Sequence, residues 1–135
     1  MTDKELYGLA VKAMEYSYSP YSDCKVGAAL LSKNGKVFTG TNIENAAFGP
    51  TVCAERVAVF KAVSEGEKEF SKIAVVGGKG GLINGIFAPC GVCRQVLREF
   101  CKDDFEILLG ETADSYKTVT LKDLLPLSFS PDNVK

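Results

Sequence analysis

The sequence predicts an α/β fold with three layers (α-β-α), in which a mixed five-stranded sheet carries helices on both faces. Three observations predict this fold. Helical and strand-like segments alternate along the chain, the central strand segments are continuous apolar runs, and no repeat or linker divides the 135 residues. With 46% hydrophobic and 24% charged residues, the chain is expected to form a single domain, residues 1–135, with a buried core and a polar surface.

The first third of the chain predicts a helix followed by a hairpin. Residues 3–17 place apolar side chains at helical spacing, until Ser19-Pro20 ends the pattern. Strands are expected at 26–31 and 36–39, because these segments flank Asn34-Gly35, a pair typical of β-hairpin turns. An irregular segment, 42–52, is expected to follow.

The remaining elements follow the same reasoning. Residues 53–64 are helical in pattern and nearly all apolar, which predicts a buried helix. The glycine-rich segment 77–85 does not match a phosphate-binding motif and is interpreted as a flexible connection. The other expected elements are strands at 73–76, 106–109 and 116–120, and helices at 90–101 and 121–125.

Composition narrows the possible partners and the compartment. A net charge of −1 argues against nucleic acid or an acidic membrane as an electrostatic partner. No apolar run approaches the roughly 20 residues of a membrane span, and the polar N-terminus lacks the order of a signal peptide. Five cysteines, an odd number, then indicate a reduced, cytoplasmic protein.

Three cysteines predict a metal site. Cys90 and Cys93 lie one helical turn apart on the same helix face, and Cys53 stands at the start of another expected helix. The chain contains no histidine, so a metal here must be bound through sulfur or oxygen. Three thiolates suit Zn²⁺, and two helix N-termini would favour their negative charge.

The alternatives are a structural zinc site with four thiolates, or buried free cysteines. Cys101 lies eight residues beyond Cys93, about 12 Å along a helix, and is too distant to share the ion. Cys24 is not excluded by spacing, but it lacks the usual paired arrangement. Three ligands favour a catalytic site, which keeps a fourth position open for water.

Charged residues beside the cysteines predict the chemistry. Glu55 follows Cys53 by two residues, where a carboxylate could take a proton from water that the metal activates. The simpler alternative is an acid that complements the helix dipole. Arg56 and Arg94 lie in first helical turns, where a cation is normally disfavoured; we expect Arg56 to face Cys53 and Arg94 to face Cys90, each offsetting thiolate charge.

These motifs resemble a known family. Cys53-Ala54-Glu55 with Pro89-Cys90-Gly91-Val92-Cys93 is similar to the three-cysteine form of the zinc-deaminase signature. Four further segments are similar to one group of these enzymes: Val26-Gly27-Ala28-Ala29-Leu30, Asn42-Ile43-Glu44-Asn45-Ala46, Cys53-Ala54-Glu55-Arg56 and Leu124-Leu125-Pro126. Residues from about 6 to 131 thus resemble the small cytidine deaminases of the homotetrameric type.

The resemblance implies hydrolytic deamination of free cytidine and deoxycytidine in pyrimidine salvage. It implies zinc on Cys53, Cys90 and Cys93, with Glu55 moving protons to ring N3 and to the departing amine. It further implies that Asn42 and Glu44 hold the ribose 3′-hydroxyl, which an amide and a carboxylate suit chemically. The other implied substrate contacts are Ala46 and Phe48 in the segment that lines the nucleoside, the backbone of Ala54, and Phe129, which reaches a neighbouring subunit's site.

Two departures and two alternatives accompany this resemblance. Cys24 stands where the family usually has a phenylalanine beside the base, and the 77–85 loop is longer than usual. One alternative is a deaminase of a nucleoside antibiotic such as blasticidin S, a family that lacks the Asn42-Ile43-Glu44-Asn45 run. The other is a non-catalytic binding module stabilised by zinc.

Overall fold

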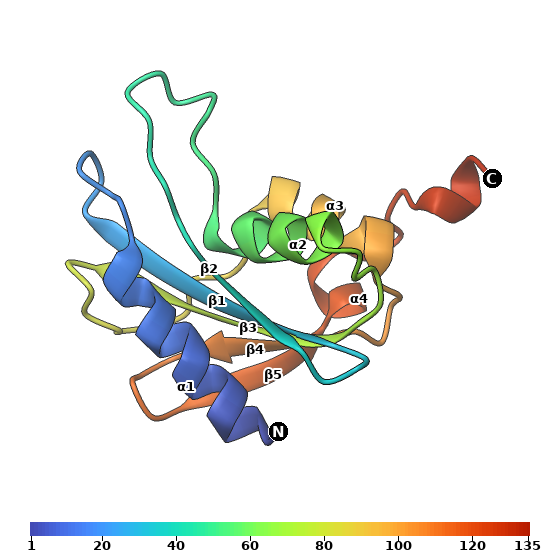
Figure 1. Cartoon of the computed structure of the whole chain (residues 1–135), viewed down its shortest axis with the longest axis horizontal. Coiled ribbons are helices and arrows are strands. Elements are labelled where there is room, and N and C mark those ends of the chain that lie inside the picture. Colours follow the sequence, from blue (N-terminus) through green and yellow to red (C-terminus); the bar gives the residue numbers. More distant parts are fainter.

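The computed structural model describes residues 1–135 and places a mixed sheet between two helical layers (Figure 1). Helix α1 covers one face of the sheet, and α2, α3 and α4 cover the other. None of the helices has both the length and the apolar character needed to cross a membrane. In chain order the elements are α1 (Asp3–Ala13), β1 (Cys24–Ser32), β2 (Val37–Thr41), α2 (Ala54–Ser64), β3 (Phe70–Lys79), α3 (Gly91–Phe100), β4 (Glu106–Gly110), β5 (Tyr116–Thr120) and α4 (Leu121–Leu124), with short 3₁₀ helices at Met14–Tyr16 and Pro131–Asn133.

The sheet confirms the predicted mixed topology. Its strand order is β2-β1-β3-β4-β5, with β3 and β4 parallel and every other neighbouring pair antiparallel. A parallel pair needs a crossover connection, which α3 supplies. The five strands and two helical layers therefore form the three-layer architecture expected from the sequence.

Two apolar cores form because the central strands are buried on both faces. In β1, Ala28 and Leu30 pack toward α2 and α3, whereas the intervening Ala29 packs toward α1. Strand β3 alternates in the same way, with Val75 on one face and Val76 on the other. Because the residues that face each of the two layers are apolar, these strands appear in the sequence as continuous hydrophobic runs.

The glycine-rich connection is shorter than the sequence predicted. Strand β3 runs on through Gly77 and Gly78 to Lys79, which pair with β1. A Cβ on Gly78 would lie 1.8 Å from the Leu82 carbonyl oxygen, and one on Gly77 would lie 2.9 Å from the Phe87 ring. These two glycines therefore allow close packing within a strand, and they are not part of a flexible connection.

A close contact between β2 and α2 fixes the start of the helix that follows Cys53. A Cβ on Gly40 would lie 2.3 Å from the Ala54 carbonyl oxygen and 2.7 Å from the Ala58 nitrogen. The absence of a side chain at this position thus lets the first turns of α2 lie directly on strand β2.

We predict that Gly40→Ala destabilises the protein by about 1–3 kcal/mol or more, because the new methyl group overlaps helix backbone. Gly8→Ala is the matched control. Gly8 is exposed within α1 with nothing within 4 Å of an added Cβ, so this change is expected to stabilise by roughly 0.5–1 kcal/mol. Thermal unfolding of both variants measures the difference, and equal melting temperatures would contradict the packing argument.

Candidate active site

The three cysteines predicted as metal ligands converge in the structure. Their sulfur atoms all lie within 4.8 Å of one another, with 3.8 Å between Cys53 and Cys90 and 3.5 Å between Cys90 and Cys93. Cys53 is the N-cap residue of α2, Cys90 is the N-cap of α3, and Cys93 lies in the first turn of α3. The start of each helix therefore brings its sulfur ligands to one point.

This cluster fits a zinc ion. Tetrahedral zinc with Zn–S bonds of about 2.3 Å places its sulfurs about 3.8 Å apart, close to the spacings observed. Thiolates are the preferred zinc ligands, and no histidine competes for the position. Cys101 is buried in the core beneath α2 and α3, outside the cluster, as the helical spacing predicted.

Backbone and side-chain electrostatics favour a thiolate at Cys53. Neither Cys53 nor Cys90 makes a side-chain capping bond to its own helix, and both lie at the positive ends of the two helices. In the metal-free protein, a hydrogen bond from Cys93 and a second from Arg56 lower the pKa of Cys53 to about 5. Cys53 is therefore ready to bind a cation near neutral pH.

The two arginines behave differently. The Arg56 guanidinium donates to the Cys53 sulfur at 3.4 Å, which confirms the expected pairing. Arg94 does not make the expected contact with Cys90. Its Nε donates to the Pro89 carbonyl and its Nη1 to the Leu124 carbonyl, both at 2.7 Å. The carbonyl at the end of α4 is without an intrahelical partner and attracts this donor, so Arg94 ties α4 to the start of α3.

Glu55 is a buried carboxyl beside the sulfur cluster. Only 3% of the residue is exposed, and burial followed by the nearby Cys53 charge raises its pKa to about 7. A cation held by the three sulfurs would favour the ionised carboxylate. Without a cation Glu55 is close to the balance between its two protonation states, so a bound cation would move it toward the ionised form, which can accept a proton.

A cavity of about 280 Å³ opens from this cluster. Cys53, Ala54, Glu55 and Cys90 line it, and all four were predicted as site residues. Asn42 and Glu44 line it as well, although they belong to the segment after β2. The remaining lining residues are Ser22, Cys24, Val26, Thr51, Val52, Phe87 and Ala88.

Asn42 and Glu44 are held in place by hydrogen bonds. The Asn42 side chain accepts from the Val26 backbone and donates to the Cys24 carbonyl, so it joins the segment after β2 to β1. Glu44 accepts from the backbone N–H groups of Tyr21 and Ser22 and from the Ser22 hydroxyl. The Ser22 hydroxyl above all, and then these N–H groups, lower the pKa of Glu44, which keeps the carboxylate ionised.

Three predicted substrate contacts lie outside the cavity. Ala46 and Phe48 are exposed in the 42–52 segment, which projects from the sheet in Figure 1. Phe48 lines a smaller pocket of about 200 Å³ that adjoins the cavity through Ser22, Glu44 and Thr51. Phe129 is 63% exposed on the C-terminal tail, whose start is held by a hydrogen bond from Gln95 to the Phe129 carbonyl.

Phe87 and Ser22 line the cavity but were not predicted from the sequence. Phe87 lies in the loop between β3 and α3, two residues before Pro89, and no motif distinguishes it. Ser22 lies in the turn before β1, where its interaction with Glu44 depends on contacts between distant segments. Only proximity in sequence to Pro89-Cys90 and to Cys24 could have pointed to these two residues.

Comparison with known proteins identifies the family. Residues 1–108 match the model of the cytidine and deoxycytidylate deaminase zinc-binding region. The chain belongs to this family. Among its relatives is a cytidine deaminase of Halalkalibacterium halodurans, 45% identical over 93% of this chain and 92% of that protein. Another, from Sporosarcina psychrophila, is 42% identical over 99% of this chain and 96% of the relative.

Solved structures of this deaminase family share the fold. A cytidine deaminase from Burkholderia pseudomallei has a TM-score of 0.87 and 45% identity, covering 96% of this chain and 100% of the other. One from Mycobacterium tuberculosis has a TM-score of 0.80 and 38% identity, covering 96% and 98%. A blasticidin-S deaminase of Bacillus cereus is 34% identical over 82% of this chain and 81% of that protein.

We predict that Cys90→Ala loses bound zinc while Cys24→Ala keeps it. Cys90 belongs to the sulfur cluster, whereas Cys24 lines the cavity outside it, so only the first change removes a ligand. Metal content per chain, measured by mass spectrometry after desalting, checks both. Loss of zinc from Cys24→Ala would instead indicate a fourth thiolate ligand and a structural site.

We predict that Arg56→Gln raises the pKa of Cys53 in the metal-free protein, because the change removes the cation that hydrogen-bonds this sulfur. The pH dependence of Cys53 alkylation, which follows the thiolate, should then move to higher pH. Arg94→Gln is the control, since Arg94 binds carbonyl oxygens and should leave the profile unchanged. Superimposable profiles for Arg56→Gln and the parent protein would show that Arg56 does not stabilise the thiolate.

Proposed function

We propose that the protein catalyses zinc-dependent hydrolytic deamination of free cytidine and deoxycytidine, releasing ammonia and forming the corresponding uridine. One observation carries this proposal: a buried carboxyl, Glu55, lies beside three converging thiols and lines a nucleoside-sized cavity with two of them. The relatives named cytidine deaminase support the choice of substrate. We further propose that the enzyme acts in the cytoplasm, in pyrimidine salvage, where its five free cysteines would stay reduced.

Cys53, Cys90 and Cys93 would hold the zinc, and two of these cysteines, Cys53 and Cys90, line the cavity. When bound, zinc supplies a Lewis acid that lowers the pKa of water to about 7. Glu55 would accept one proton from the attacking water and deliver it to ring N3. Glu55 then takes the second water proton to the departing amine, so that oxygen replaces nitrogen on C4 and ammonia leaves.

Asn42 and Glu44, which also line the cavity, suit the sugar. The ionised Glu44 carboxylate accepts hydrogen bonds, and Asn42 retains one amide hydrogen that its structural bonds leave free. Together they offer an acceptor and a donor to a ribose 3′-hydroxyl. The backbone of Ala54 would meet the pyrimidine carbonyl, and Ala46 and Phe48 would border the nucleoside from the 42–52 segment.

The Glu44 carboxylate also favours a substrate whose sugar carries no phosphate. Glu44 is negative, and no lysine or arginine lines the cavity, so the phosphate of a nucleotide would meet repulsion there. A free nucleoside carries no such charge. The charges of the cavity's own side chains therefore favour a nucleoside over a nucleotide.

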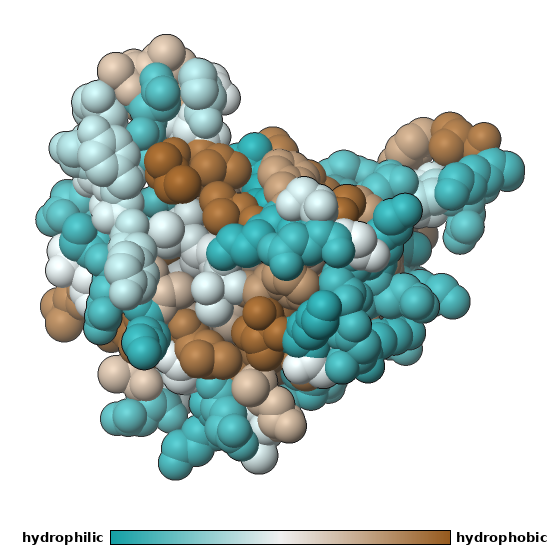
Figure 2. Space-filling view, in the orientation of Figure 1, coloured by the Kyte–Doolittle hydropathy of each residue, from teal (hydrophilic) through white to brown (hydrophobic).

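We propose a homotetramer in which Phe129 serves a neighbouring subunit. Apolar side chains remain exposed on α2, on α3 and on the tail, including Phe60, Val92 and Leu127. Figure 2 shows apolar atoms on the surface between the 42–52 segment and the C-terminal tail, both of which project from the body. Such surface is typical of an interface between subunits.

Analytical ultracentrifugation should therefore show a tetramer, and Phe129→Ala should raise KM for cytidine with its zinc content unchanged. The removed ring makes no contact with this chain's own cavity, so an effect on KM would come from an adjacent subunit. A fully active monomer would contradict the proposed assembly.

We predict that Glu55→Gln lowers kcat for cytidine by at least about 10²–10⁴-fold while zinc remains bound. The amide has about the size of the carboxyl group but cannot accept a proton. Residue 55 is not one of the three sulfur ligands, so the change should leave zinc bound. Loss of cytidine absorbance gives the rate, and metal analysis gives the zinc content. Near-normal turnover by Glu55→Gln would contradict the proposed proton transfer.

A substrate panel separates this proposal from its alternatives. We expect turnover of cytidine and deoxycytidine by the zinc-loaded protein. Turnover of blasticidin S alone would indicate an antibiotic deaminase, and zinc without turnover on any of the three would indicate a binding module.

A further inference from the structure

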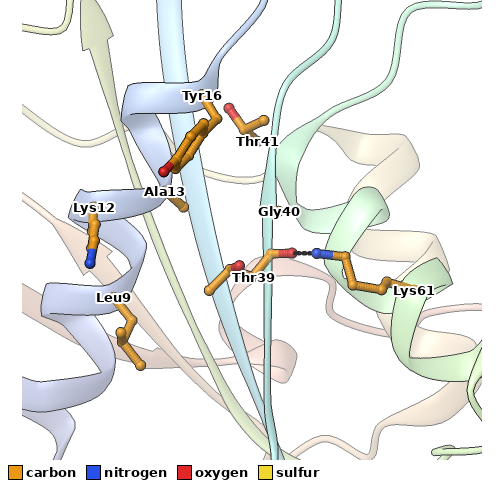
Figure 3. Close-up of a pocket in the computed structure, with 8 residues that line it drawn as sticks. All are labelled: Leu9, Lys12, Ala13, Tyr16, Thr39, Gly40, Thr41 and Lys61. Carbon is orange, nitrogen blue, oxygen red and sulfur yellow. Dashed lines mark hydrogen bonds between the residues drawn. The ribbon is translucent and has the colours of Figure 1, made fainter.

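A second concavity lies between α1 and strand β2, away from the catalytic cavity. Its volume is about 350 Å³, somewhat larger than that of the catalytic cavity, and the two share no lining residue. Figure 3 shows Leu9 and Ala13 on the side of α1 toward β2, Tyr16 above them, and Lys61 bonded to Thr39 from the other side of the strand. The lining residues include Leu9, Lys12, Tyr16, Thr39 and Lys61. We call this concavity the α1–β2 groove.

The wall formed by β2 offers unpaired backbone groups. Strand β2 is at the edge of the sheet. Immediately after its last residue, the Asn42 N–H donates to the Val26 carbonyl, so this pair continues the β1–β2 register and is a hydrogen-bonded position. Since paired and unpaired positions alternate in an antiparallel ladder, the backbone N–H and C=O of Thr39 point away from β1. The Thr39 carbonyl accepts a hydrogen bond from Lys61 at 2.5 Å, which leaves the Thr39 N–H as a free donor at the open edge.

The charges of the groove are all of one sign. Lys12 and Lys61 are its only charged lining residues, and neither forms an ion pair. Lys61 is also held in position by its bond to Thr39 and keeps two further N–H donors for another partner. In a chain with a net charge of −1, two unpaired cations on one groove favour an anionic ligand.

The rest of the groove is apolar. Leu9 and Ala13 line it from α1, and the Tyr16 ring, 74% exposed, stands beside them. An exposed aromatic ring can stack on a planar group or cover an alkyl group. The groove therefore combines a cationic, donor-rich side with an apolar side.

We propose that the α1–β2 groove binds a small organic anion, with a phosphate or carboxylate head group attached to a planar apolar body. The head group lies beside Lys61 and accepts from the Thr39 N–H, and Lys12 adds positive charge from the α1 wall. The body packs on Tyr16 and Leu9. An extended peptide fits less well, because an added strand would need the Thr39 carbonyl that Lys61 already occupies.

Calorimetric titration of the zinc-loaded protein with phenyl phosphate, in the absence of nucleoside, tests this proposal. We expect saturable binding that Lys12→Met together with Lys61→Met weakens roughly tenfold, because two charge-assisted contacts are lost. Lys4→Met is the matched control, since Lys4 is exposed on the same helix outside the groove and should change binding less than about twofold. Because binding is measured without turnover, its outcome is separate from that of the proposed deamination.

Further ligands define the recognised chemistry. Benzoate tests whether a carboxylate replaces the phosphate, and inorganic phosphate tests the apolar body. We expect Tyr16→Ala to weaken phenyl phosphate roughly threefold and to leave inorganic phosphate unchanged. The proposal is overturned if phenyl phosphate does not bind, if the double lysine variant binds it as well as the parent does, or if only an acidic peptide binds.

Discussion

The convergence of two helix N-termini on three sulfur atoms is the constraint on which the rest of the site depends. Each helix begins at a cysteine, so a shift of either helix along its axis would separate the sulfurs. Gly40 lets α2 lie directly on the sheet, and Arg94 ties the start of α3 to α4. The fold thus specifies the metal geometry through contacts between helix backbones and their supports.

The cavity has two electrostatic environments that suit the two ends of a nucleoside. The buried Glu55 has a raised pKa and lies beside the sulfur cluster. The less buried Glu44 is hydrogen-bonded to the Ser22 hydroxyl and to backbone N–H groups and has a lowered pKa. Two carboxylates with opposite shifts in pKa can take different roles, proton transfer at one end and binding at the other.

The sequence predicted the elements whose signal is local. The spacing of Cys90 and Cys93, the apolar helix after Cys53 and the Asn-Gly hairpin all depend on neighbouring residues, and the structure contains each of them. Features that depend on distant contacts were missed or wrong. Gly77 is in a strand because β1 pairs with it, and the position of Arg94 depends on α4, which no local pattern reveals.

X-ray absorption at the zinc edge tests the central claim most directly, since it reports the atoms bound to the metal. The account predicts three sulfurs at about 2.3 Å and one lighter ligand at about 2.0–2.1 Å, consistent with an open position that faces the cavity. Four sulfur ligands would contradict it. The site would then be structural, with a further cysteine closing the position that the proposed chemistry requires.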